Sequence, residues 1–238
     1  MTHRLLVVLI VSLVLAVPAA ARYLLVPMDL DQTDHLKAYG HTFHALQAGE
    51  KVTWLLNYRG GSFLMRDTAR ARTDARLMGV FYEELGEADV QQIRQVVQQE
   101  NMEEVLLEKP PEIAIYTPPN MQPWADAVTL ALTYAEAPYE TIYDHQVLRG
   151  DLDQYDWLHL HHEDFTGQYG KFWGSFGLQD WYVEQQELNE ELARELGYPT
   201  VWRLKHAVAL AIRSYVESGG FVFAMCSATD TIDIALAF

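Results

Sequence analysis

The stretch Gly220-Phe221-Val222-Phe223-Ala224-Met225-Cys226, followed by Ser227-Ala228-Thr229-Asp230-Thr231, decides the fold class of this chain. The apolar and aromatic run before Cys226 predicts a buried strand, and the small polar residues after it predict the first turn of a helix. A strand that breaks sharply into a helix at a nucleophile-type residue is how several hydrolase folds expose an attacking atom. The sequence leaves two interpretations of its only cysteine open, a nucleophile at this turn or an inert residue that packs as a small hydrophobe.

Outward from this turn, short apolar runs alternate with longer segments of helical period, which predicts an α/β protein with a mostly parallel sheet. The predicted strands are Tyr23–Pro27, Lys51–Leu56, Glu112–Thr117, Tyr139–Tyr143, Asp156–His161 and Gly220–Met225. The predicted helices are Thr33–Ala48, Arg66–Met78, Glu87–Glu100, Trp124–Glu136, Asp180–Leu196 and Val201–Ser218. Pro110-Pro111 is short for a linker, and each half has few strands for a core of its own. We therefore expect one continuous doubly wound sheet over residues 22–238.

The first 21 residues have the pattern of a secretory signal peptide. His3 and Arg4 form a weakly basic start, Leu5 to Val17 form an apolar core, and Ala19-Ala20-Ala21 is an A-x-A cleavage site. A membrane-spanning helix needs about 18 to 20 apolar residues, and Pro18 and Arg22 cut this run short. We expect an exported protein that leaves the membrane after cleavage, with an uncleaved tether as the alternative.

The charge balance restricts the partners. A formal charge of -16, from 33 acidic and 17 basic residues, disfavours nucleic acids and anionic membrane surfaces through repulsion. A single cysteine forms no internal disulfide, so packing has to stabilise the chain. The expected partner is a small-molecule substrate or ligand, and nothing in the sequence calls for a cofactor.

Polar residues follow most of the predicted strands. In an open parallel sheet, ligands bind beyond the carboxyl ends of the strands, so these residues are expected to meet in one cleft. The residues predicted to bind a ligand there are Asp29, Asn57, Arg59, His161, Asp164 and Ser227. Ser227 follows the cysteine and would offer its backbone N–H to an oxyanion, while Ala224 and Ala228 leave room for a tight turn.

The predicted strand Asp156–His161 contains two histidines, and His162, Glu163 and Asp164 follow it directly. Alternation places His159 and His161 on one face, with His162 at the tip. One hypothesis makes His162 or His161 the base that deprotonates Cys226, oriented by Glu163 or Asp164. A second makes His159, His161 and Glu163 a metal site, and a third leaves the histidines as hydrogen-bonded core residues.

These features resemble the class I glutamine amidotransferase-like superfamily, whose flavodoxin-like sheet presents a cysteine at a G-x-C-x-G turn. More specifically, a set of short strings resembles a group of exported bacterial proteins labelled asparagine synthetase B. The strings are 25–29, 35–40, 54–61, 156–167 and 223–235. The resemblance spans nearly the whole mature chain and implies a cysteine-dependent enzyme acting on C–N bonds.

The chain departs from these families at several positions. Ala224 and Ala228 replace the glycines of the turn, and no histidine follows Cys226, where the superfamily has its catalytic one. The apolar ending predicts a truncated chain whose relatives continue further. The sequence also lacks an N-terminal cysteine and the S-G-G-x-D-S loop of synthetases. Our first hypothesis is therefore an amide hydrolase with Cys226, His162 and Glu163 as catalytic residues. The alternatives are a non-catalytic small-molecule or sugar-binding module and, third, a metal-dependent hydrolase.

Overall fold

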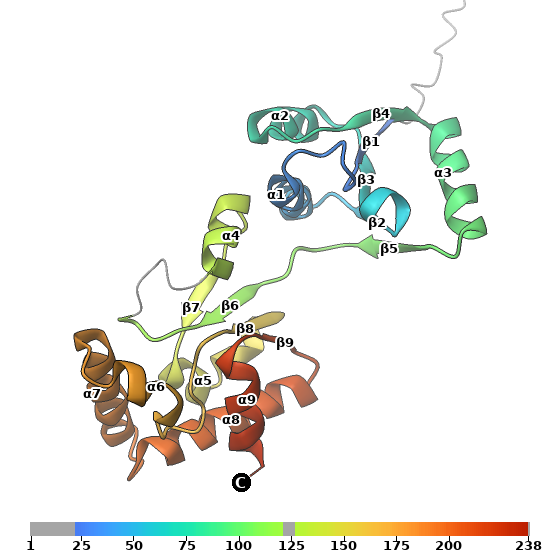
Figure 1. The fold of residues 1–238 in the computed structure, drawn as a ribbon. Helices are drawn as coiled ribbons and strands as arrows, with labels where there is room; N and C mark the ends of the chain where they lie inside the picture. The colour runs from blue at the N-terminus through green and yellow to red at the C-terminus, as the bar shows by residue number, and fades with distance from the viewer. Residues whose placement is uncertain (1–21, 121–126, 238) are drawn as a thin grey trace, which may run out of the picture.

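The structure is a computed structural model, and it describes residues 22–120 and 127–237. The predicted signal peptide and the start of the helix predicted from Trp124 lie outside these residues. The described chain is an α/β protein with two sheets, each part of its own unit (Figure 1).

The first unit contains a five-stranded antiparallel sheet in the order β4-β1-β3-β2-β5. Its strands are β1 (Arg22–Val26), β2 (Val52–Leu56), β3 (Ser62–Arg66), β4 (Glu83–Gly86) and β5 (Glu103–Leu107), and its helices are α1 (His35–Gln47), α2 (Ala69–Met78) and α3 (Glu87–Gln99). Successive side chains of a strand point to opposite faces, so β1 contributes apolar residues to both faces of the sheet. Leu24 and Val26 pack toward α1 and α2, whereas Leu25 packs toward α3. Both faces of this sheet are therefore covered by helices.

The second unit contains a four-stranded parallel sheet in the order β7-β6-β8-β9. Its strands are β6 (Ile113–Tyr116), β7 (Glu140–Ile142), β8 (Trp157–Leu160) and β9 (Phe221–Ala224), and its helices are α4 (Ala127–Ala135), α5 (Asp144–Arg149), α6 (Gly170–Phe176), α7 (Asp180–Glu195), α8 (Val201–Glu217) and α9 (Ser227–Leu236). Helices α5, α8 and α9 cover one face of this sheet, and α4 lies on the other side, between the two units (Figure 1). The main core fills the space between the sheet and α5, α7, α8 and α9.

Contacts between α1 and α4 join the two units. A Cβ atom on Gly40 would lie 1.8 Å from the carbonyl oxygen of Ala135, so a glycine is required where these helices cross. Around the crossing, Lys37 forms an ion pair with Glu136 at 2.7 Å, and His44 bonds the Glu136 carbonyl at 3.0 Å. This close crossing brings the first unit against α4 of the second.

The expectation of one continuous, mostly parallel sheet is wrong. Strands β3, β4 and β5 were missed, and they convert the first half of the chain into a separate antiparallel sheet. The physical cause lies between β2 and β3, where Asn57, Arg59, Gly60 and Gly61 all have positive φ values of 46° to 97°. Consecutive left-handed residues reverse the chain tightly, so β3 returns antiparallel beside β2 instead of crossing over through a helix.

Candidate functional site

Cys226 lies in the turn between β9 and α9, directly before the first residue of α9, with φ 51° and ψ -131°. An L-residue rarely adopts this conformation, because its Cβ crowds the backbone, and such a residue costs about 1 to 3 kcal/mol unless its surroundings hold it. The thiol is exposed to solvent. Cys226 therefore does not pack as a small hydrophobe, and the sharp strand-to-helix turn predicted from the sequence is present.

Hydrogen bonds fix this turn to the end of β8. The Met225 N–H donates to the Leu160 carbonyl at 2.9 Å, and the Ala228 N–H donates to the His161 carbonyl at 3.1 Å. The Ser227 hydroxyl donates to the His162 carbonyl at 2.8 Å. Cys226 and the histidine-rich tip of β8 consequently lie at the same edge of the parallel sheet, as the sequence predicted.

A fourth hydrogen bond extends this contact into α9. The Thr231 hydroxyl donates to the carbonyl of Glu163 at 2.8 Å. Ala228 is completely buried where the turn meets the tip of β8. A larger side chain at this position would push the turn away from the tip, which is the physical reason for a small residue here.

His159 lies on the face of the sheet opposite Leu158 and Leu160, which belong to the main core. His159 is fully buried between the rings of Phe223, at 5.9 Å, and His161, also at 5.9 Å. The rings of His161 and His162 stack with their centroids 3.6 Å apart. The predicted alternation of His159 and His161 on one face is therefore confirmed.

The two acids that follow the histidines are engaged by the local backbone. Glu163 is 6% exposed, and its carboxylate accepts the His161 N–H at 2.8 Å. The Asp164 carboxylate accepts the N–H of Thr166 at 2.9 Å and that of Tyr169 at 2.8 Å, which shapes the following loop. Among the described residues, no group of three His, Cys, Asp or Glu side chains is arranged to hold a metal ion, and this includes the proposed set of His159, His161 and Glu163.

A buried polar network lies beneath this tip, and the sequence analysis missed it. Lys205 of α8 is 3% exposed and donates to Asp144 at 2.8 Å, to Tyr143 at 2.9 Å and to Tyr116 at 3.0 Å. Burial alone would lower the pKa of Lys205, but the Asp144 carboxylate outweighs it and the net pKa is raised. Burial is also the main cause that raises the pKa of Tyr143 to about 12.

This network forms part of the wall of a small polar cavity of about 50 Å³ at the carboxyl end of the sheet. His162, Glu163 and Asp164 line the same cavity. The missed signal was the position of Lys205 on the apolar stripe of α8, four residues after Val201 and three before Val208, which are both buried. A lysine on such a stripe indicates a buried charge with a partner.

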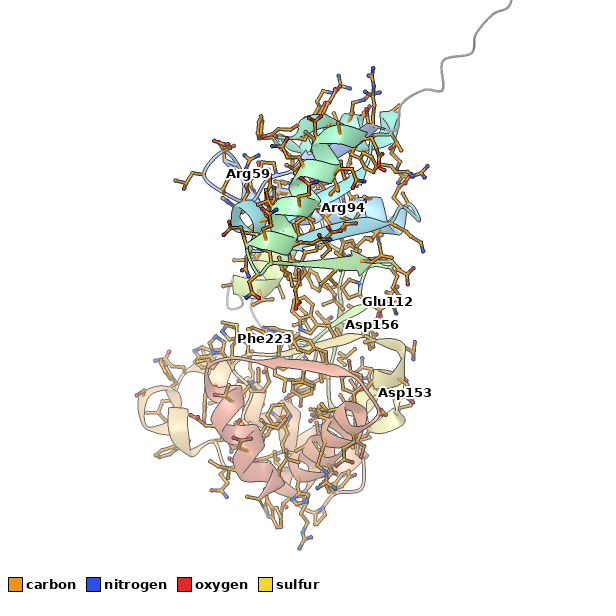
Figure 2. The ribbon with its side chains drawn as sticks, turned by 90° about the vertical axis from the view of Figure 1, so that its right-hand side faces the viewer. Arg59, Arg94, Glu112, Asp153, Asp156 and Phe223 are labelled. Atoms are coloured by element: carbon orange, nitrogen blue, oxygen red, sulfur yellow. The ribbon has the colours of Figure 1, made fainter. Side chains whose placement is uncertain are left out.

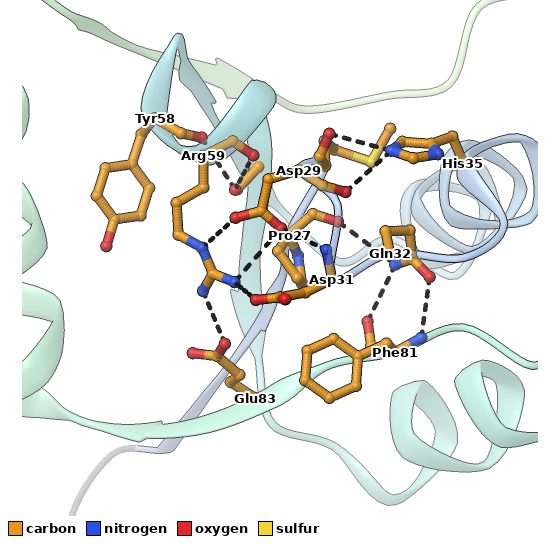
Figure 3. Close-up of polar contacts among 11 residues, drawn as sticks. Pro27, Asp29, Asp31, Gln32, His35, Tyr58, Arg59, Phe81 and Glu83 are labelled. Atoms are coloured by element: carbon orange, nitrogen blue, oxygen red, sulfur yellow. Dashed lines mark hydrogen bonds and ion pairs between the residues drawn. The ribbon is translucent and has the colours of Figure 1, made fainter.

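The remaining predicted ligand residues lie in the other unit. Arg59 is placed by the β2–β3 connection, far in the fold from β9, where Figure 2 labels Phe223. The Arg59 guanidinium bonds Asp29 at 2.6 Å, Asp31 at 2.7 Å and Glu83 at 2.7 Å (Figure 3). The hydrogen bond from Arg59 holds the pKa of the Asp29 carboxyl below its usual value.

The expected single cleft therefore does not form. Asp29 and Arg59 bind each other within the first unit, and Asn57 is exposed on the same connection with φ 65°. His161, Asp164 and Ser227 gather at the carboxyl edge of the second sheet. The reason is the antiparallel topology, which separates the ends of β1 and β2 from the edge at which the parallel strands end.

Comparison with known proteins gives no relative: the chain matches no protein-family model, no curated protein and no solved structure. In the part of the chain that the structure describes, no helix is both long enough and apolar enough to cross a membrane. The interpretation of the site therefore depends on its own geometry.

Proposed function

We propose that this protein is a cysteine-dependent hydrolase of amide C–N bonds, with Cys226 as nucleophile. The observation that carries the proposal is the backbone of Cys226, an exposed residue with φ 51° and ψ -131° between a strand and a helix. Proteins keep strained residues of this kind mainly at functional sites, because each one costs stability. At such a turn the side chain projects from the sheet edge, where a substrate can reach it.

The chemistry follows from the groups at this edge. The Cys226 sulfur attacks the amide carbonyl carbon while His162 takes the thiol proton, and the negative charge that develops on the oxygen faces the Ser227 N–H in the first turn of α9. The C–N bond then breaks, the leaving amine takes the proton from His162, and a thioester remains. Water hydrolyses the thioester to a carboxylic acid and restores the thiol. In this scheme Glu163, next to His162, orients the base.

The order of the parallel strands supports the finer fold assignment. In chain order the second sheet runs 2-1-3-4, which is the beginning of the flavodoxin-like order 2-1-3-4-5. In that fold, ligands bind at the carboxyl edge, where the chain changes direction between the first and third strands. In this sheet that position lies between β6 and β8, next to His162 and Glu163. We propose a flavodoxin-like unit of the class I amidotransferase-like type, as in the exported proteins labelled asparagine synthetase B.

Alkylation tests the nucleophile directly, because Cys226 is the only cysteine and any labelling reports on it. We expect iodoacetamide to modify the folded protein faster than the unfolded chain at neutral pH, and His162→Asn to slow the reaction by about tenfold. His145→Asn, at an exposed position of α5, is the matched control and leaves the rate unchanged. Equal alkylation rates in the folded and unfolded protein, with no effect of His162→Asn, would contradict the role of Cys226 as a nucleophile.

Intact-mass measurements test the hydrolysis itself. Incubation with a panel of 4-nitroanilides is expected to produce an acyl adduct on the wild-type protein and none on Cys226→Ala. A reactive thiol that forms no adduct and releases no nitroaniline would contradict amide hydrolysis while leaving the reactive turn in place.

A second candidate is the non-catalytic binding module of the same fold. It is favoured by the stacking of His161 on His162, whose ring centroids lie 3.6 Å apart. In that case Cys226→Ser would leave ligand binding unchanged.

We also propose that the protein acts outside the cytoplasm on a small molecule, and Edman sequencing of the secreted protein should then start at Arg22.

A further inference from the structure

A cavity of about 230 Å³ lies where the loop after Asp164, the first turns of α8 and the last turns of α9 meet. Its lining residues are Phe165, Thr166, Gln168, Trp202, His206, Ile234 and Ala235. Ala235 follows Ser227 by eight positions on α9, which is about 12 Å along a helix. This cavity is therefore separate from the proposed catalytic turn.

The loop is built to form one wall of the cavity. Gly167 has φ +61°, and a Cβ atom there would lie 2.7 Å from both the N and the Cα atoms of Trp202. Only glycine lets the loop pass this close to the first turn of α8. Asp164 also accepts the N–H groups of Thr166 and Tyr169 and the Thr166 hydroxyl, so the backbone of the loop and the Thr166 side chain are held in place.

The walls combine an apolar surface with a few polar groups. Phe165 and Ala235 are buried behind the cavity, and Trp202 remains 43% exposed although it belongs to its wall. The Arg203 guanidinium lies over the Trp202 ring, 4.5 Å from its centroid, which steadies the indole. Apolar walls with a small number of fixed polar side chains are typical of small-molecule sites.

The polar groups define the chemistry of the ligand. Thr166, Gln168 and His206 supply a hydroxyl, an amide and an imidazole, which together donate and accept hydrogen bonds. Among the described residues that line the cavity there is no Asp, Glu, Lys or Arg, so these residues offer a charged ligand no partner of opposite charge. The Thr166 hydroxyl already bonds the Asp164 carboxylate and accepts the Gln168 N–H at 3.4 Å, so Gln168 and His206 are the polar side chains that a purely aromatic ligand would not use.

We propose that this cavity binds the pyranose ring of a sugar. A pyranose offers C–H faces to an indole and a rim of hydroxyl groups that both donate and accept hydrogen bonds. The volume of about 230 Å³ suits one ring rather than a chain of sugars. The site goes beyond the proposed hydrolase activity, because no residue of the catalytic turn takes part in it.

Calorimetric titration of the full chain with glucose, galactose, mannose, xylose and N-acetylglucosamine tests the site. At least one sugar is expected to bind saturably with a millimolar Kd, and Trp202→Ala should weaken it by about tenfold. Trp173→Ala is the matched control, because Trp173 is 61% exposed and lies outside the cavity. Gln168→Ala, on the exposed loop, should weaken binding without a change in Tm.

Three results would overturn the proposal. The first is the absence of saturable binding of every sugar at concentrations up to about 50 mM, which is well above a millimolar Kd. The second is equal binding by the wild type and the Trp202→Ala variant with an unchanged circular dichroism spectrum. The third is tighter binding of phenol than of any sugar, which would assign the cavity to aromatic ligands. None of these results depends on Cys226, so the hydrolase proposal is tested independently.

Discussion

The strained backbone at Cys226 predicts an unusual stability effect. Cys226→Gly should unfold at a higher temperature than Cys226→Ala, although glycine normally destabilises a folded chain. Both variants remove the exposed thiol, and only alanine keeps the Cβ that crowds the backbone at φ 51°. The strain is worth about 1 to 3 kcal/mol, and the extra freedom of glycine in the unfolded chain offsets about 0.5 to 1 kcal/mol. The glycine variant should therefore be more stable by up to about 2.5 kcal/mol, with a mid-range difference of about 1.3 kcal/mol.

Scanning calorimetry of three matched pairs measures this effect. At about 2 to 4 °C per kcal/mol, a mid-range difference raises Tm by about 4 °C. Asp233, an exposed residue within α9, provides the comparison, because glycine there should be less stable than alanine by about 1 kcal/mol. Ser218, which caps α8 with φ -87°, should show the same ordinary order. If Cys226→Gly is no more stable than Cys226→Ala, the turn is not strained and the argument for a functional cysteine fails.

Three further predictions concern the packing and the buried charges. Gly40→Ala should lower Tm, because its Cβ would collide with α4, whereas Gly174→Ala, which has open space around it, should raise Tm or leave it unchanged. Lys205→Met should cost about 3 to 5 kcal/mol in urea unfolding, since it leaves the Asp144 carboxylate buried without its cation, and the added Asp144→Leu change should recover part of that loss. Burial lowers the pKa of His41, so the unfolded chain takes up a proton at a higher pH than the folded protein does. As the pH is lowered below about 6.5, the free energy of unfolding should therefore decrease, by at most about 1.4 kcal/mol per pH unit. Urea unfolding of His41→Gln at several pH values should lack this decrease.

The apolar pattern of the sequence was sufficient to locate six of the strands. All six strands predicted from the sequence are present, with each end within one residue of the prediction. Two of the three missed strands, β4 and β5, lack that pattern, whereas β3 contains the buried apolar run Phe63-Leu64-Met65. β4 is Glu83-Glu84-Leu85-Gly86, and β5 begins with Glu103-Glu104. Acidic residues and glycine disfavour strands in isolation, and these segments become strands because β1 and β2 offer them backbone partners.

Topology was the less predictable part of the fold. Alternating strands and helices favour a parallel sheet, and the second half of the chain follows that rule. In the first half, the pair Gly60-Gly61 fits either a loop before the helix predicted from Arg66 or a hairpin connection, and the structure shows the hairpin, which closes on β3. Only the positive φ values distinguish the two, and composition does not specify them. The ligand residues Asp29, Asn57 and Arg59 were therefore assigned to the wrong edge.

For the candidate site, the sequence predicted which segments meet but not how their side chains are used. The pairing of the Cys226 turn with the tip of β8 followed from two parallel strands ending at one edge, and four hydrogen bonds connect them. The role of Glu163 in holding the His161 N–H was not predictable, since it depends on a rotamer. The same holds for the partner of Lys205, which lies on α5, 61 residues earlier in the chain.

The backbone angles of Cys226 differ from those of three other described non-glycine residues with positive φ. Asn57, Arg59 and Tyr169 have ψ values of -7°, 50° and 4°, which belong to the left-handed helical region that ordinary turns use. Cys226 combines φ 51° with ψ -131°, where the Cβ has no such tolerated basin. A fold that needed only a turn there could have used glycine, as it does at Gly79 and Gly150. The chain instead places a thiol at this position and fixes it to β8 with hydrogen bonds. Strain that surrounding hydrogen bonds hold at an exposed thiol is what the proposed catalytic role predicts and what packing alone does not explain.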